Sequence, residues 1–110
     1  MINLKNKIIL ITGASGLIGS YLSKHLEKSG CKLILVDNNK KKLISLKKKL
    51  NKSFFLANCD LCNIEEITSF CSSIKKKFNK IDVLIHLASP VGTSKLKGWN
   101  TEFKYQNIKN

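Results

Sequence analysis

The chain of 110 residues is long enough for one small domain, and its formal net charge is +13. All 20 basic residues are lysine. The absence of arginine, which suits bidentate recognition of phosphate and guanine, argues against a surface built for nucleic acid. No apolar run approaches the length of a membrane span or resembles a secretory signal, so we expect a cytoplasmic protein with reduced thiols.

The first expected strand covers residues 7–12 and the first expected helix covers residues 17–29. Residues 8–11 are all apolar and mostly β-branched, which is typical of a buried parallel strand. Gly30 is expected to end the helix. The helix would face the sheet with apolar side chains at helical spacing, namely Ile18, Leu22 and Leu26.

A glycine-rich turn, Thr-Gly-x-x-Gly-x-x-Gly at residues 12–19, joins this strand to this helix. The context is that of a dinucleotide-binding fingerprint. Gly13 permits a tight turn, Gly16 lets the backbone approach a pyrophosphate, and Gly19 lets the helix pack closely. The free N–H groups at the helix start would face the phosphates, and Ser15 can add a hydroxyl donor.

The second strand is expected over residues 32–36 and ends in Asp37, and a helix follows over residues 40–50. Asp37 lies 24 residues after Gly13, close to the offset of about 20 residues at which a carboxylate binds the ribose hydroxyls. The alternative is that Asp37 caps the following helix. The buried stripe of that helix would consist of Leu43, Leu46 and Leu50.

The third strand is expected over residues 54–57 and the third helix over residues 64–78, with Asn63 as N-cap and Glu66 at capping-box spacing. Between them, Cys59 and Cys62 form a Cys-x-x-Cys pair. A single pair without a second pair or a nearby histidine is a poor zinc site, and the adjacent carboxylate disfavours a redox role, so we expect no metal. The helix would bury Ile67, Phe70, Cys71, Ile74 and Phe78.

The fourth strand is expected over residues 81–87, and its continuous apolar character predicts burial on both faces. Ligands in open α/β sheets bind outside the carboxyl ends of the strands. Four separate stretches, carrying Gly13, Asp37, Asp60 and His86 with Ala88, would therefore meet at one rim. The alternative for His86 is a satisfied structural histidine beside the sheet.

In these motifs the chain resembles the short-chain dehydrogenase/reductases. The glycine pattern at residues 12–19 is similar to that of the extended branch, which includes nucleotide-sugar epimerases and dehydratases. Asp60-Leu61 resembles the acidic pair that meets the adenine ring, and residues 86–89 resemble the His-x-Ala motif after the fourth strand. Ser89-Pro90-Val91 is also similar to reductases of the dihydroflavonol and cinnamoyl type.

The resemblance implies a Rossmann-type, doubly wound parallel α/β sheet in the order 3-2-1-4, cut after the fourth strand, with residues 1–110 as one partial domain. We expect NAD rather than NADP as cofactor, because the carboxylate of Asp37 would repel the additional phosphate of NADP. Lysines 40–42 could offset this repulsion. The expected cofactor-binding residues are Gly13, Ser15, Gly16, Leu17, Ile18, Gly19, Asp37, Asp60, Leu61, His86 and Ala88.

The family also implies a catalytic Tyr-x-x-x-Lys pair, in which the lysine lowers the pKa of the tyrosine. Tyr105 and Lys109 have that spacing, but no fifth strand precedes them, so we expect the catalytic pair and most of the substrate pocket outside this chain. The chain would then be an inactive cofactor-binding segment of an oxidoreductase or epimerase, and the whole protein could be a homo-oligomer. Two alternatives stay open: a dinucleotide-binding protein without turnover, and a lysine-rich polyanion binder.

Overall fold

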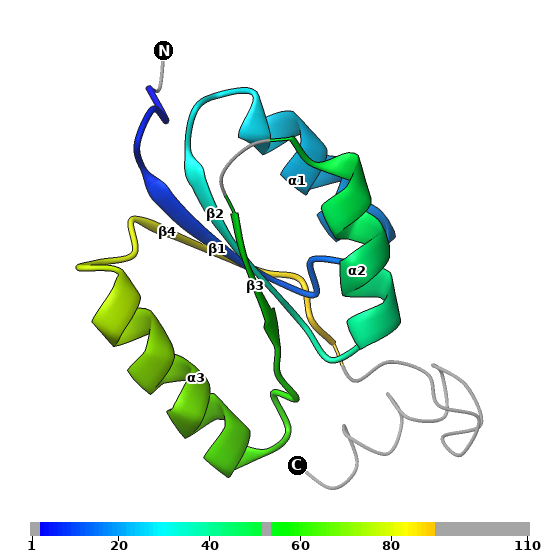
Figure 1. Ribbon diagram of the computed structural model, residues 1–110, viewed down its shortest axis with the longest axis vertical. Coiled ribbons are helices and arrows are strands. Elements are labelled where there is room, and N and C mark those ends of the chain that lie inside the picture. The colour runs from blue at the N-terminus through cyan, green and yellow to red at the C-terminus, as the bar shows by residue number, and fades with distance from the viewer. Residues whose placement is uncertain (1–2, 52–53, 90–110) are drawn as a thin grey trace, which may run out of the picture.

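The computed structural model describes residues 3–51 and 54–89, which form a four-stranded parallel sheet with helices on both faces (Figure 1). The strands lie in the order β3-β2-β1-β4, which confirms the expected fold class and topology. Helices α1 and α2 cover one face of the sheet and α3 covers the other. The elements are β1 (Ile8–Thr12), α1 (Leu17–Glu27), β2 (Lys32–Asp37), α2 (Lys40–Lys49), β3 (Phe54–Asn58), α3 (Ile64–Lys77) and β4 (Val83–His86).

Two apolar clusters hold the layers together, because alternate residues of a strand point to opposite faces of the sheet. The cluster under α1 and α2 is built on Ile9, Ile11, Leu33 and Leu35. The cluster under α3 contains Leu10, Ile34, Val36, Cys59 and Ile74. Side chains buried on both faces make β1 and β2 the centre of the sheet, as their unbroken apolar runs predicted.

The first turn of α1 differs from the prediction, because the side chain of Ile18 is 67% exposed rather than packed on the sheet. This turn lies beyond the carboxyl end of β1, so no strand is underneath it. On the buried side of the helix, Gly19 lies against the glycine turn, and Ser23 and Glu27 follow further along. Leu22 packs at the margin of the core. The small residues let α1 approach the strands closely.

The other two helices follow their predicted stripes with one exception. The three leucines of the α2 stripe are buried as expected, whereas Cys71 in α3 is exposed although it was expected to be buried. Asn63 caps α3 by accepting a hydrogen bond from the Glu66 N–H. Glu66 does not complete the capping box, because its carboxylate accepts from the N–H of Asp60 instead.

Strand β4 is shorter and less buried than the sequence predicts. Leu84 is 64% exposed, although its partner across the ladder, Leu10, is buried. Among the described strands, β4 is an edge that pairs with β1 alone, so the face over Leu84 has no cover there. The side chain of Leu84 would be buried only if a further element packed over it.

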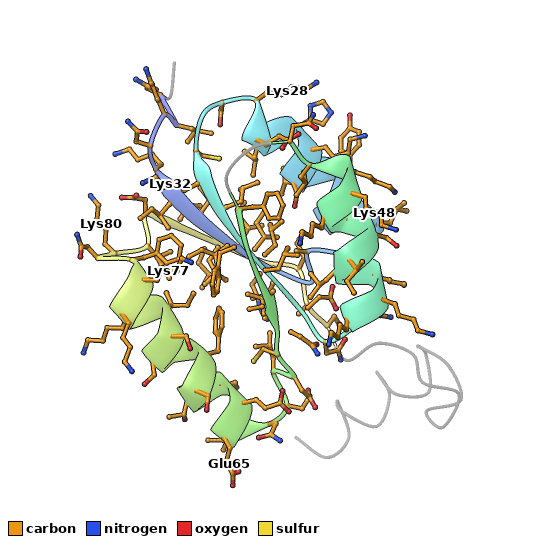
Figure 2. The ribbon with its side chains drawn as sticks, viewed as in Figure 1. Lys28, Lys32, Lys48, Glu65, Lys77 and Lys80 are labelled. Atoms are coloured by element: carbon orange, nitrogen blue, oxygen red, sulfur yellow. The ribbon has the colours of Figure 1, made fainter. Side chains whose placement is uncertain are left out.

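Among the described residues, lysines lie on more than one side of the molecule (Figure 2). Figure 2 shows Lys28, Lys48 and Lys80 on different sides of the molecule. Lysines lie on the exposed positions of α2 and in the last turn of α3, where they also complement the helix dipole. None of the described helices could cross a membrane, since α3, the longest, has 14 residues and three lysines in its last turn.

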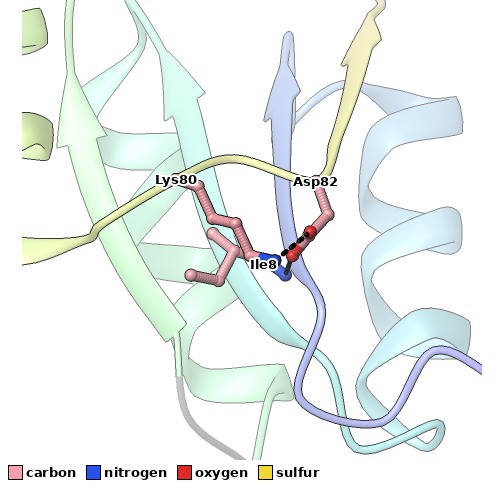
Figure 3. A network of polar contacts seen from close by, with 3 residues as sticks. All are labelled: Ile8, Lys80 and Asp82. Atoms are coloured by element: carbon pink, nitrogen blue, oxygen red, sulfur yellow. Dashed lines mark hydrogen bonds and ion pairs between the residues drawn. The ribbon is translucent and has the colours of Figure 1, made fainter.

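Asp82 fastens the start of β4 to the start of β1 (Figure 3). Its carboxylate accepts a hydrogen bond of 2.8 Å from the Ile8 N–H, and Lys80 lies 3.3 Å away. The hydrogen bond from Ile8 is the main cause that lowers the pKa of Asp82, with Lys80 and Lys7 assisting and burial opposing. The ionised carboxylate is thus the form that stabilises this junction.

We expect Asp82→Asn to lower the melting temperature at pH 7 and to have a diminishing effect as the pH falls below the unfolded pKa. A carboxyl group whose pKa is lowered by folding stabilises the fold above its unfolded pKa, near 3.9, and that contribution is lost as the pH falls through its folded pKa. Melting temperatures of both proteins between pH 7 and pH 2 test this. A constant difference over the whole range would assign the effect to packing rather than to charge.

Candidate functional site

A cavity of about 540 Å³ opens at the carboxyl ends of the strands. The glycine turn, the end of β2, the loop after β3 and the end of β4 all contribute to its wall, so the predicted convergence of four stretches is confirmed. The lining residues are Gly13, Ser15, Gly16, Val36, Asp37, Asn38, Asn39, Lys42, Cys59, Asp60, Leu61, Cys62, His86, Leu87, Ala88 and Ser89.

Most residues expected at the site are in this wall, and three are not. Leu17, Ile18 and Gly19 belong to the first turn of α1, behind the lining, and the first two point outward. Sequence reasoning did not place Asn38 or Asn39 at the site, although they directly follow Asp37 at the end of β2, and it named Ser89 only as part of a motif. Their place after a strand end was the available signal.

The turn around Gly13 is tight and is fixed to two strands. Gly13 has φ of 68°, a left-handed conformation that favours glycine, and a Cβ there would lie 2.7 Å from the backbone nitrogen of Ala88. The next residue, Ala14, donates its N–H to the carbonyl of Val36. The turn is therefore positioned by β4 and β2 together.

Gly16 and Gly19 are glycines for different reasons. A Cβ on Gly19 would lie 2.4 Å from the carbonyl oxygen of Gly13, so the backbone of the turn leaves no space for a side chain there. A Cβ on Gly16 would meet only the same oxygen, at 3.4 Å, and otherwise open space. Gly16 thus leaves room on the cavity side of the turn.

The start of α1 suits a negatively charged group. Gly16 is the N-cap and makes no side-chain cap hydrogen bond, and the first turn of the helix contains no acidic residue. The N–H groups in the first turn of a helix lack intrahelical partners, and the positive end of the helix dipole lies there. Backbone N–H groups beside an open cavity are the arrangement that binds phosphate at helix starts.

Asp37 does not cap α2, so the alternative offered for it is wrong. The N-cap is Asn39, whose side chain accepts from the Lys42 N–H at 3.0 Å. Asp37 instead accepts from Ser15 twice, from the backbone N–H at 3.0 Å and from the hydroxyl at 2.6 Å. The Ser15 hydroxyl, expected to serve a phosphate, is directed at the carboxylate.

Thr12 links the end of β1 to the end of β4. Its hydroxyl oxygen accepts from the N–H groups of Leu87 and Ala88, both at 3.2 Å, and lies 2.6 Å from Nδ1 of His86. With both lone pairs used, the hydroxyl donates its hydrogen to Nδ1, which places the ring proton of His86 on Nε2. His86 therefore has a structural partner and also lines the cavity.

The loop after β3 is held by hydrogen bonds within the loop and to the end of β2. Asp60 accepts from the Cys62 N–H at 2.9 Å, and Cys59 donates its N–H to the carbonyl of Asp37. Burial raises the pKa of the Cys59 thiol, and the carboxylates of Glu66 and Asp60 raise it further, which makes it a weak nucleophile. Within residues 3–51 and 54–89, no group of three or more His, Cys, Asp or Glu side chains could hold a metal ion.

These features fit a nicotinamide dinucleotide. The turn leaves space beside Gly16, the helix start presents N–H groups, and Asp37 presents a carboxylate at the end of the neighbouring strand. Pyrophosphate and ribose hydroxyls have matching chemistry. Tyr105 and Lys109, the pair with the catalytic spacing, lie outside the described residues.

The chain is similar in sequence to known reductases. A 3-oxoacyl-(acyl-carrier-protein) reductase of Rickettsia typhi is 39% identical over 85 residues, which cover 77% of this chain and 34% of that protein. The chain thus spans about a third of the length of the curated relatives that it matches first.

Solved structures share the fold. A 3-ketoacyl-(acyl-carrier-protein) reductase from Brucella melitensis, complexed with NADH, aligns with a TM-score of 0.66 and 26% identity over 74% of this chain and 34% of that one. A metagenomic short-chain oxidoreductase in complex with NADP aligns with a TM-score of 0.73 and 23% identity over 83% of this chain and 42% of that one. Both cofactors therefore occur among the structural neighbours.

The expected affinity with the extended branch is not supported, since these relatives are reductases rather than epimerases. It rested on the glycine spacing and on the His-x-Ala motif at residues 86–88, which shape the turn and the strand end and do not distinguish the reactions that follow. The family model described as short chain dehydrogenase matches residues 7–108. The chain belongs to the short chain dehydrogenase family.

Proposed function

We propose that this chain is the NAD-binding part of an oxidoreductase and that its catalytic residues lie outside the 110 residues. The observation that carries the proposal is the cavity at which the open side of Gly16, the uncapped start of α1 and the carboxylate of Asp37 meet. In this arrangement the helix start holds the pyrophosphate, and Asp37 accepts hydrogen bonds from the adenosine ribose. Asp60 and Leu61 flank the adenine, and His86 and Ala88 form the wall at the β4 end.

The bound cofactor would supply or accept a hydride at its nicotinamide ring. The relatives named above are ketoacyl reductases, so the proposed substrate class is a carbonyl compound or the corresponding alcohol. A tyrosine and lysine four residues apart would handle the proton in the rest of the protein. This chain supplies the binding and orientation of the cofactor.

We propose NAD rather than NADP because Asp37 faces the cavity as a carboxylate. A 2′-phosphate about 4 Å from it would be repelled by about 1 kcal/mol in water and about 4 kcal/mol at an effective dielectric constant of 20. Lys42 also lines the cavity and offsets part of this repulsion. An ion pair formed by an exposed lysine contributes little, so the repulsion between the carboxylate and the phosphate determines the preference.

We propose a cytoplasmic location, with which the free thiols are compatible. We also propose that the whole protein can form a homo-oligomer. Two other functions are weaker. A dinucleotide-binding protein without turnover would have the same site, and the sequence beyond residue 110 distinguishes it. A polyanion binder is disfavoured because all 20 basic residues are lysine and none is arginine, the residue suited to bidentate phosphate recognition.

Titration of the chain with NAD, NADP and a short DNA duplex tests the proposal. We expect NAD to bind about ten- to a hundredfold more tightly than NADP, which corresponds to about 1.4–2.7 kcal/mol. NAD at a hundred times its Kd should stabilise the fold by about 2.7 kcal/mol. Stabilisation by DNA alone would support the polyanion alternative, and equal affinity for the two cofactors would remove the ribose role of Asp37.

A further inference from the structure

Ser15 makes two hydrogen bonds to the same oxygen atom of Asp37. Its backbone N–H and its hydroxyl lie 3.0 and 2.6 Å from Oδ2, although the two residues are 22 positions apart in the chain. Ser15 belongs to the glycine turn and Asp37 to the end of β2. The glycine turn, where the phosphates are proposed to bind, is therefore connected through Ser15 to Asp37, where the ribose is proposed to bind.

The contact is of the strong kind and is partly buried. An O–H to carboxylate distance of 2.6 Å is typical of a charge-assisted hydrogen bond. Ser15 is buried, so water does not readily replace its hydroxyl as the donor. On the other carboxylate oxygen, the N–H of Asn39 donates at 3.3 Å. Asp37 is thus held by donors on both oxygens.

These bonds also limit how Asp37 can meet a ligand. A carboxylate has about four lone-pair positions, and the donors of Ser15 and Asn39 use three of them. The lone-pair position that remains is on Oδ1, the oxygen that accepts the hydrogen bond from the Asn39 N–H. A ligand hydroxyl can donate there, whereas a phosphate oxygen has no hydrogen to donate.

We propose that Ser15 is a positioning residue that sets the preference for NAD over NADP by fixing the carboxylate of Asp37. The proposal rests on the function proposed above. A fixed carboxylate is ready to accept from a ribose hydroxyl, because its rotamer freedom is already lost. It is also unable to turn away from a 2′-phosphate.

Removal of the Ser15 hydroxyl releases half of this restraint on Oδ2. The carboxylate can then rotate away from an incoming phosphate, which leaves the phosphate to Lys42 in the same cavity wall. NAD loses a prearranged acceptor while NADP loses a repulsive neighbour. The two affinities therefore move in opposite directions, and their ratio is the sensitive measurement.

A double-mutant cycle on Ser15 and Asp37 tests the proposal, with Kd values for NAD and NADP measured for each protein. We expect Ser15→Ala to lower the ratio of NADP Kd to NAD Kd by about three- to tenfold, which is the net contribution of one typical hydrogen bond. In the Asp37→Asn background the same substitution should change the ratio by less than about twofold. Ser20→Ala, in α1 and outside the cavity wall, is the matched control and should leave the ratio unchanged.

Ser15→Cys keeps the shape of the side chain at a somewhat larger size and weakens its donor, and it gives the same test should Ser15→Ala fail to fold. An unchanged ratio in a folded Ser15 variant, or an equal effect with and without the Asp37 carboxylate, would overturn the positioning role while leaving NAD binding intact. Failure of the wild-type chain to bind either cofactor would overturn the proposed function and this inference with it.

Discussion

Gly19→Ala is expected to destabilise the fold by about 3 kcal/mol or more, the upper range for overpacking. The added Cβ would lie 2.4 Å from the carbonyl oxygen of Gly13 and 2.6 Å from that of Ala14. Both are backbone atoms of the turn, so no side chain can move aside to relieve the contact. The turn is also hydrogen-bonded to β2 through Ala14, and its displacement would disturb the sheet.

Urea denaturation measures this loss, and Gly16→Ala is the matched control. The same methyl group at Gly16 has no neighbour closer than 3.4 Å, and the backbone there has φ of −71°, which any residue adopts. We expect its stability to stay within about 1 kcal/mol of wild type. Comparable stability of the two variants would mean that α1 does not pack against the turn as described.

Much of this fold could be predicted because its central strands are buried on both faces. The unbroken apolar runs of β1 and β2, each ending in a polar or glycine-rich turn, indicated a parallel sheet and its carboxyl edge. Two of the errors concern the margin of the sheet. Ile18 and Leu84 are apolar and exposed because one lies beyond a strand end and the other on an edge strand. Periodicity shows which face of an element is apolar and not whether a neighbour covers it.

The candidate site likewise has features that could be predicted from the sequence and features that could not. The positions of Gly13, Asp37 and His86 at one rim follow from strand ends, which the sequence shows. The partnership of Ser15 with Asp37, and of Thr12 with His86, joins residues 22 and 74 positions apart. Such contacts depend on the distance between two elements after packing. The sequence therefore predicted which residues meet and not which of them bond to each other.

Gly16→Val is expected to weaken NAD binding more than about a hundredfold while the chain remains folded. The position is open on the cavity side, so a valine side chain enters the space beside the start of α1 rather than the protein interior. A hundredfold loss corresponds to about 2.7 kcal/mol, within the affinity that pyrophosphate contacts at a helix start supply. The cost to stability is the loss of glycine from an N-cap, about 1 kcal/mol.

Calorimetric titration with NAD, together with urea denaturation, separates the two effects. Lys24→Val places the same side chain on an exposed position of α1, away from the cavity, and should bind NAD as the wild type does. The comparison matters because Gly13→Val is expected to lose binding by a different route, through the 2.7 Å contact of its Cβ with Ala88 and unfolding of the turn. Undiminished NAD affinity in folded Gly16→Val would place the pyrophosphate elsewhere and would withdraw the helix start from the proposed site.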